Sequence, residues 1–250
     1  MNLLTISADA KTVKGEKKGL LTAIMYLAPW KLSGYQVCPL AEVAGCVGDC
    51  LNTAGRGGMA RPDADTIEID GHIVKLNAIQ KARIARTRFF FENRIEFMTQ
   101  LFKEIRLAKK KADKMGFDFA VRLNGTSDIR WEDVIYLGKN VFEHFAEVFF
   151  YDYTKIPNRK IAGIKNYHLT FSYSARPEFQ KIFLKAREFY GSKINHAFVY
   201  MKVMPKTFMG LTVVNGDEDD ARFKDAPGIA IALKAKGRAR KSNSGFALAA

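Results

Sequence analysis

Apolar, strand-like segments alternate with helical segments along this chain of 250 residues, and this alternation constrains the fold more than any other feature. Short apolar runs bounded by polar turns are typical of buried strands, whereas apolar residues that recur every three or four positions indicate helices. The sequence predicts strands at residues 19–28 (with a short helix as the alternative), 117–128 (running into a polar turn), 147–155, 166–174, 196–203, 210–217 and 227–237.

The longest helical pattern covers residues 75–114, and its length favours two helices over one. Shorter helices are expected at 130–146 and 177–191, the second with Pro177 near its start and Gly191 at its end. The stretch between the first strand and the long helical region is loop-like, with a small hairpin expected at residues 65–71.

Strands that alternate with helices predict an α/β fold with a mostly parallel sheet covered by outer helices. Six or seven strands suit a partial (β/α) barrel better than a full eightfold barrel. A doubly wound sheet is the alternative, but no G-x-G-x-x-G follows the first strand. We expect one domain over residues 1–237 and a basic, flexible tail over 238–250.

Composition restricts the class of protein. Hydrophobic residues make up 48% of the chain, which is enough for a large core without disulfide bonds. The chain starts without the apolar run of a signal peptide, and no stretch approaches the roughly 18 apolar residues of a membrane span. With an odd number of cysteines, these features predict a cytoplasmic protein with reduced thiols and no membrane association.

The formal net charge is +14, from 40 Lys and Arg against 26 Asp and Glu. Such a charge favours polyanionic partners, with nucleic acid as the first candidate. Basic residues gather at 103–114, 155–165 and 234–241. The alternative interpretation is that these are solvated helix faces and a basic tail, which keep the protein in solution.

Polar residues follow the predicted strands at the points where the strands end. The carboxyl ends of parallel strands meet at one edge of a sheet, and sites form there. Residues placed at this edge are Asn124, Thr126, Ser127, Asp128, Asp152, Tyr153, Lys155, His168 and Ser172. The alternative is that these residues serve only as turns and helix caps. The acidic stretch 217–225 is expected to be a solvated loop, with contact to a metal or cofactor as the alternative.

All three cysteines, Cys38, Cys46 and Cys50, lie in one short segment after the first predicted strand, with the spacing C-x7-C-x3-C. A structural zinc site needs four ligands, so a distant histidine would have to complete it. Three thiolates on a [4Fe–4S] cluster leave one iron open, which suits a cluster that binds a substrate or cofactor directly. The thiols can also be small buried residues without a metal.

The cysteine loop after the first strand of a βα series resembles that of the radical S-adenosylmethionine enzymes. In that superfamily three cysteines hold a [4Fe–4S] cluster in a partial (β/α)6 barrel, and S-adenosylmethionine binds the open iron. The superfamily spacing is C-x3-C-x2-C, and "NGTSD" stands here where those enzymes carry Gly-Gly-Glu.

The chain also resembles a bacteriophage family called gene-product-88-like, over nearly its whole length. The stretches that carry this resemblance are "KTVKGEKKG", "LAPWKLSG", "CPLAEVAGCVGDCLNTAGRG", "VRLNGTSDIRWE", "FYDYTK", "NYHLTFSYS", "VVNGDEDDARFKD" and "LKAKGRA". This resemblance implies a phage origin and a location in the cytoplasm of the infected host cell.

The superfamily resemblance implies an iron–sulfur protein that acts as a radical S-adenosylmethionine enzyme with a separate reductant, and the basic charge suggests a nucleotide or nucleic acid as its substrate. Cys38, Cys46 and Cys50 would hold the [4Fe–4S] cluster. Asn124, Thr126, Ser127, Asp128 and Ser172 would bind S-adenosylmethionine, and the substrate side would be formed by Asp152, Tyr153, Lys155 and His168.

The alternative is a non-enzymatic iron–sulfur or zinc protein that binds nucleic acid, with a structural or redox-sensing cluster. In that case the basic segments would contact the phosphate backbone, and Trp131, Tyr151 and Tyr153 would provide surfaces on which bases stack.

Overall fold

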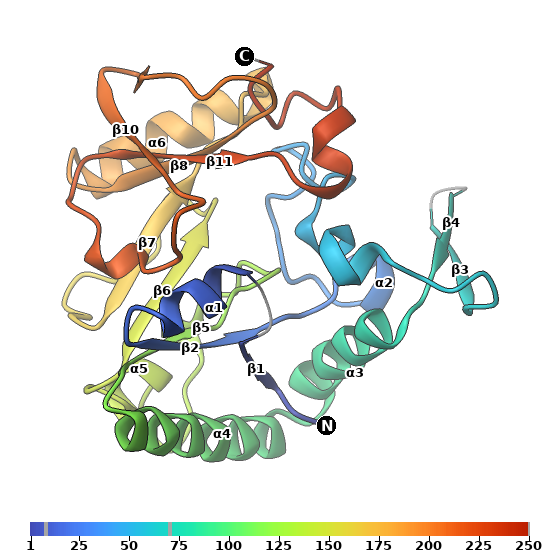
Figure 1. The fold of residues 1–250 in the computed structure, drawn as a ribbon, viewed down its shortest axis with the longest axis vertical. Coiled ribbons are helices and arrows are strands. Elements are labelled where there is room, and N and C mark those ends of the chain that lie inside the picture. Colours follow the sequence, from blue (N-terminus) through green and yellow to red (C-terminus); the bar gives the residue numbers. More distant parts are fainter. Residues whose placement is uncertain (8–9, 70–71, 250) are drawn as a thin grey trace.

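A single large sheet organises the computed structural model, which describes residues 1–7, 10–69 and 72–249 (Figure 1). Within these residues the sheet has nine strands in the order β1-β2-β5-β6-β7-β8-β11-β10-β9. Their bounds are β1 Leu4–Ile6, β2 Leu20–Met25, β5 Asp118–Arg122, β6 Phe149–Thr154, β7 Tyr167–Ser172, β8 Asn195–Tyr200, β9 Thr207–Phe208, β10 Leu211–Asn215 and β11 Ala230–Lys234.

The seven strands from β2 to β10 in this order pair in parallel, and the short strands β1 and β9 add antiparallel edges. The prediction of a mostly parallel α/β sheet is therefore confirmed. No closed barrel forms among the described residues, because β1 and β9 remain as two separate edges. Figure 1 shows the sheet bending between β2 at one end and β11 at the other, so that it has a concave side.

The helices are α1 Ala10–Glu16, α2 Trp30–Ser33, α3 Ala78–Glu92, α4 Arg94–Met115, α5 Val141–His144 and α6 Gln180–Tyr190. Helices such as α4 and α6 cover the convex side of the sheet, whereas α1 lies on the concave side, where its Lys11 lines the cavity described below (Figure 1). Apolar residues of α4 such as Phe97 and Leu101 pack with Val121 of β5 in one core. Phe183 of α6 packs with Phe171 of β7 and Phe198 of β8 in a second core.

The long helical region is two helices, as its length indicated. Asn93 separates α3 from α4, with φ −136° and ψ 63°, which is outside the helical region. No helix among the described residues has the length and apolar character that crossing a bilayer would require.

The prediction of a helix over 130–146 is wrong. Only a 3-10 turn at Trp131–Asp133 and the four-residue α5 form there. Leu137 and Gly138 both have positive φ, of 50° and 80°, and this left-handed turn brings Tyr136 opposite Lys139. A helix cannot pass through such a turn, and the apolar residues around it reach the core from irregular backbone instead.

The predicted hairpin at 65–71 is an antiparallel pair of β3 (Thr66–Ile69) and β4 (His72–Lys75), shifted slightly along the chain. Residues 70 and 71, on which the predicted turn falls, lie outside the described residues.

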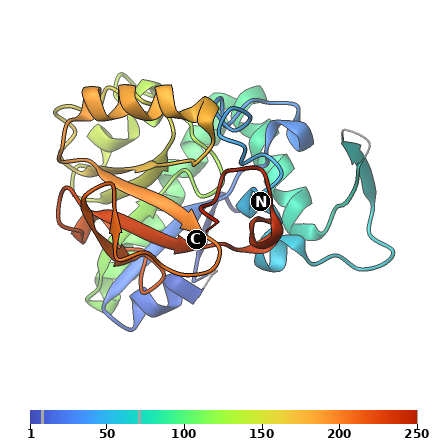
Figure 2. The ribbon, with the colours of Figure 1, turned by 90° about the horizontal axis from the view of Figure 1, so that it is seen from above.

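The C-terminal segment from residue 238 packs on the domain, although the sequence placed a flexible tail there. Leu248 donates its N–H to the carbonyl of Val199 at 2.8 Å and accepts from the N–H of Met201 at 3.0 Å. The hydroxyl of Ser244 donates to Asp49 in the cysteine loop at 2.6 Å. In Figure 2 this red segment lies on the side of the molecule where the cysteine loop runs. It therefore covers part of the concave side.

Candidate functional site

The carboxyl ends of the parallel strands surround a cavity of about 230 Å³. Its lining comes from the loops or ends of β2, β5, β6, β7, β8, β10 and β11, and from Ala239 and Phe246 of the C-terminal segment. Sites in parallel α/β folds occupy this position because the loops after the strands converge there.

Ten of the twelve site residues expected from the sequence line this one cavity. They are Cys38, Cys46, Cys50, Asn124, Thr126, Ser127, Asp128, Tyr153, Lys155 and Ser172. The structure therefore brings together the cysteine loop, the 124–128 turn and the ends of β6 and β7. Asp152 and His168 lie elsewhere.

His168 is on the same inward face of β7 as Ser172, but it sits four residues earlier in the strand. Four residues of strand span about 13 Å, so His168 lies toward the opposite end of the sheet from the cavity. Its ring is partly buried near Arg222, and burial together with that positive charge lowers the pKa of His168.

Asp152 lies on the convex face of β6, because neighbouring strand residues point to opposite sides. Its carboxylate accepts hydrogen bonds from the backbone N–H of Asn124 at 2.7 Å, from Asn124 Nδ2 at 3.3 Å and from the hydroxyl of Tyr167 at 3.0 Å. Asp152 therefore holds the 124–128 turn in place from behind, while its own carboxylate stays outside the cavity.

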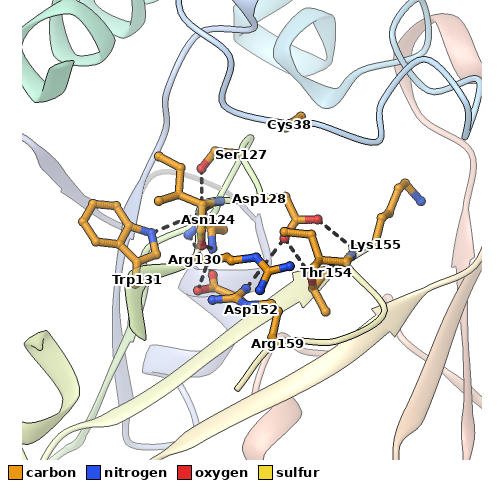
Figure 3. Close-up of polar contacts among 12 residues, drawn as sticks. Cys38, Asn124, Ser127, Asp128, Arg130, Trp131, Asp152, Thr154, Lys155 and Arg159 are labelled. Atoms are coloured by element: carbon orange, nitrogen blue, oxygen red, sulfur yellow. Dashed lines mark hydrogen bonds and ion pairs between the residues drawn. The ribbon is translucent and has the colours of Figure 1, made fainter. Parts of the chain in front are cut away.

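The 124–128 turn is built around the side chain of Asn124 (Figure 3). Asn124 Oδ1 accepts from Ser127 Oγ at 2.8 Å, from the N–H of Ile129 at 3.0 Å and from Trp131 Nε1 at 3.2 Å. Gly125 approaches the first parallel strand so closely that a Cβ there would lie 2.6 Å from the carbonyl oxygen of Met25. The amide of Asn124 thus fixes the turn, and Gly125 allows it to pack against β2.

Asp128 ties the turn to the end of β6 (Figure 3). It accepts from Thr154 Oγ at 2.8 Å and from the N–H of Lys155 at 2.7 Å. Behind it the fully buried Arg159 lies 3.6 Å from Asp128 and donates from Nε to Glu132 at 2.9 Å. Burial raises the pKa of Asp128, while the positive charge of Arg159 and these hydrogen bonds oppose the rise.

The three cysteines are free thiols that reach the cavity from a single loop. Cys38 Sγ lies 3.8 Å from the carbonyl oxygen of Thr126, and Cys50 Sγ accepts from the N–H of Asn52 at 3.4 Å. Arg83 of α3 anchors the loop by donating from Nη1 to the carbonyl and side-chain oxygens of Asn52, both at 2.9 Å.

Burial raises the pKa of all three thiols, that of Cys50 to about 11. The other two cysteines and Asp128 raise the pKa of Cys38 further, because each adds negative charge nearby. Thiolates would therefore form here when a bound cation compensates their charge, as metal binding does.

The cysteine side chains suit a cluster in their chemistry, since thiolates are the usual ligands of iron–sulfur clusters. Within the described part of the chain, no three His, Cys, Asp or Glu side chains are placed to hold a single metal ion. The three thiols line one cavity, but among the described residues they are not gathered around a common point that would hold one ion.

Lys155 brings a positive charge to the cysteine side of the cavity. Its Nζ donates to the carbonyl oxygen of Ser172 at 3.0 Å and to the hydroxyl of Ser172 at 2.9 Å. Burial lowers the pKa of Lys155, and the negative charges of Cys46, Asp128 and Cys38 oppose this. The ammonium group is thus placed to compensate negative charge on thiolates or on a bound ligand.

Sequence reasoning missed Lys11 of α1 and Arg122 of β5, which also line the cavity. It assigned the 217–225 stretch to solvent, but Asp217 and Asp220 line the cavity and Asp220 is buried. Phe119, Val121 and Leu123 all pack in the core beneath α4, so the alternation of the strand directs Arg122 to the opposite, inward face. Lys11 and Asp220 are distant in sequence, and only the fold brings them together.

The buried carboxyl of Asp152 predicts a pH dependence of stability. Burial chiefly raises its pKa from 3.8 to about 7. The folded protein then holds this proton more tightly than the unfolded chain, so the contribution to stability is present in acid and disappears between about pH 4 and pH 7. Between these pH values we expect the unfolding free energy of Asp152→Asn to fall by about 1–3 kcal/mol less than that of the wild type.

The measurement is urea unfolding of wild type and Asp152→Asn at several pH values between 4 and 8. The exposed Asp133→Asn is the matched control and should keep the wild-type slope. An Asp152→Asn protein whose unfolding free energy changes with pH as the wild type does would contradict the assignment.

Comparison with known proteins places the whole chain in one family. The sequence model of the family described as Gene product 88 matches residues 2–250. No curated protein and no solved structure matches the chain. The match includes the cysteine loop, the 124–128 turn and the C-terminal segment, so one family pattern spans all parts of the cavity. The resemblance to the gene-product-88-like bacteriophage family is thereby confirmed, and the chain belongs to the Gene product 88 family.

Proposed function

We propose that this protein is an iron–sulfur enzyme in which Cys38, Cys46 and Cys50 hold a [4Fe–4S] cluster whose open iron binds S-adenosylmethionine. The observation that carries the proposal is that three thiols from one loop line the same cavity as a polar turn and a buried lysine at the carboxyl ends of parallel strands. When bound, such a cluster supplies an electron for cleavage of S-adenosylmethionine.

The side chains of the cavity have separate tasks in this proposal. Lys155 compensates negative charge beside the thiols and can pair with the carboxylate of a bound ligand. Thr126 and Ser127 lie where the 124–128 turn faces the cavity. The side-chain amide of Asn124 accepts the hydrogen bonds that hold this turn in shape. Phe246 and Ala239 of the C-terminal segment line the cavity and would shield part of a bound ligand from water.

The substrate class in this proposal is a nucleotide or nucleic acid. The formal net charge of +14 favours a polyanionic partner. Cationic side chains also line the cavity itself, with Lys11, Arg122 and Lys236 on the side formed by α1, β5 and β11. A negatively charged substrate would therefore be attracted both to the surface and to the interior of the site.

The test is the EPR spectrum of the reduced, anaerobically purified protein with and without S-adenosylmethionine, together with its iron and sulfide content. We expect a brown protein with about four irons per chain. Its reduced signal should change when S-adenosylmethionine is added, because the ligand reaches the open iron. A colourless protein that contains zinc would contradict the cluster, and an EPR signal that does not respond would contradict the cofactor.

A second candidate is a non-enzymatic iron–sulfur or zinc protein that binds nucleic acid, and the high positive charge favours it. Its distinguishing behaviour is binding to single-stranded DNA or RNA that weakens steeply with salt. Such binding, together with the absence of any response to S-adenosylmethionine, would establish this candidate in place of the enzyme.

A further inference from the structure

The side of the cavity away from the cysteines is rich in cationic side chains. Four cations, Lys11, Arg122, Lys234 and Lys236, line it together with two carboxylates, Asp217 and Asp220. We call these six residues the cationic end. Positive groups outnumber carboxylates there by two, so the free cationic end carries excess positive charge.

The electrostatic neighbours of each group separate the cationic end from the thiols. The charges that act most strongly on Lys11 are those of Asp220, Lys236 and Asp217. Those that act most strongly on Cys38 are Cys50, Asp128 and Cys46. The cavity therefore has two chemically different ends, one with thiols and one with cations.

The two carboxylates at the cationic end are already used to hold the end together. Asp217 lies 3.2 Å from Lys11 Nζ and 2.9 Å from Lys236 Nζ, and its other oxygen accepts from the N–H of Lys234 at 2.8 Å. Asp220 accepts from the hydroxyl of Tyr151 at 2.9 Å. These contacts bind the loop after β10 to α1 and β11 and keep the cations close together.

Arg122 is a largely buried cation with a donor left unpaired. Its side chain is 12% exposed, and its contact with Asp220 is a long one of 3.4 Å from Nη1 to Oδ2. Its Nε is buried and finds no acceptor among the described residues. The guanidinium lies 4.8 Å from the centre of the Tyr153 ring, and the hydroxyl of Tyr153 also has no partner among those residues.

Buried donors without acceptors are costly, and native proteins usually satisfy them. A guanidinium stays charged and offers several donors in one plane, which suits the oxygens of a phosphate. A phosphate carries up to two negative charges, which would balance the excess at the cationic end.

We infer that the cationic end binds a phosphate group of the substrate, with Arg122 as the main contact and Lys11 and Lys236 as supporting charges. This inference deepens the proposed function, because it assigns the end of the substrate that lies away from the cysteines. Specificity for a phosphate ester would then come from Arg122, whereas the thiols would serve the cofactor.

The test is calorimetric titration of the purified protein with inorganic phosphate at constant ionic strength. We expect saturable binding that Arg122→Gln weakens by about tenfold or more, as expected when a charged hydrogen bond is lost. Lys236→Gln should weaken it by about threefold, because its side chain is half exposed and shared with Asp217. The control Arg61→Gln removes the same charge from an exposed residue and should bind as wild type does.

Two outcomes would overturn the inference: no saturable phosphate binding, or binding that survives unchanged in both Arg122→Gln and Lys236→Gln. Lys236→Gln keeps the inference testable if the buried Arg122→Gln fails to fold. Cytidine 5′-monophosphate should bind more tightly than cytidine, and equal binding would count against a phosphate contact.

A single-stranded oligonucleotide distinguishes two sources of the phosphate group, a nucleic-acid backbone and a small phosphate ester. If it displaces cytidine 5′-monophosphate, the phosphate of a nucleic-acid backbone occupies the cationic end. If it does not, a small phosphate ester does, and the inference holds in either case. These titrations need no cluster, so their failure is separate from any failure of the EPR test.

Discussion

Cys46→Ala is expected to lose nearly all of its iron and its brown colour while keeping its fold. Cys46 is one of three thiols around the cavity, so its removal would leave the cluster with two of its three protein ligands. The thiol makes a weak hydrogen bond to the carbonyl oxygen of Ala41 at 3.6 Å and packs, partly buried, at the edge of the second core, so an alanine there costs the apoprotein little. The measurement is iron and sulfide content of anaerobically purified protein.

The matched control is Ser174→Ala, which removes the bond from Ser174 Oγ to the carbonyl oxygen of Ala44 and so loosens the same loop without removing a thiol. It should retain most of its iron. If Cys46→Ala keeps its iron and colour unchanged, the cluster assignment is wrong. Circular dichroism of both variants confirms that any loss of iron is not a loss of fold.

Arg159→Met is expected to destabilise the protein by about 3–5 kcal/mol, because it leaves a buried carboxylate without its counter-ion. Arg159 is fully buried and donates from Nε and Nη2 to the two oxygens of Glu132, at 2.9 and 2.5 Å. It also lies 3.6 Å from Asp128, which joins the 124–128 turn to the end of β6. The measurement is the free energy of unfolding in urea, compared with wild type.

The control is Arg130→Met, which removes a partly exposed arginine that bonds to Asn158 at 2.9 Å and should cost less than about 1 kcal/mol. A small effect of Arg159→Met would mean that the pair with Glu132 is not needed for stability. The double variant Arg159→Met with Glu132→Leu should recover part of the loss, since it removes both buried charges together.

Much of the sheet was predictable because the signal for a buried parallel strand is local. Continuous apolar runs such as "LLTAIM" and "AIAL" identified β2 and β11 without any knowledge of their neighbours. Strands β1 and β9 were missed, since two or three residues are too few to show a pattern. The 130–146 helix was a false prediction because its apolar residues resemble a helical pattern, although the left-handed turn at Leu137 and Gly138 interrupts it.

The two misplaced site residues have different causes. Asp152 follows Tyr151 and precedes Tyr153, and strand alternation sends it to the convex face whenever those two point inward. The alternation along the strand therefore indicated the convex face for Asp152, whereas its position near the end of the strand indicated the cavity. His168 points to the inward face of the sheet, as predicted, but it lies too far from the carboxyl end of β7 to reach the cavity. Its distance from the cavity depends on where the site lies in the assembled sheet.

By itself the sequence determined the parallel α/β class, the cysteine loop after the first parallel strand, and the post-strand turn at 124–128, because periodicity and turn chemistry are properties of neighbouring residues. Only the tertiary structure decided that Lys11, Arg122 and Asp220 meet, and that the C-terminal segment covers the cavity. These contacts join residues about a hundred or more positions apart, and they depend on the order and curvature of the strands. Local sequence patterns carry no record of that geometry.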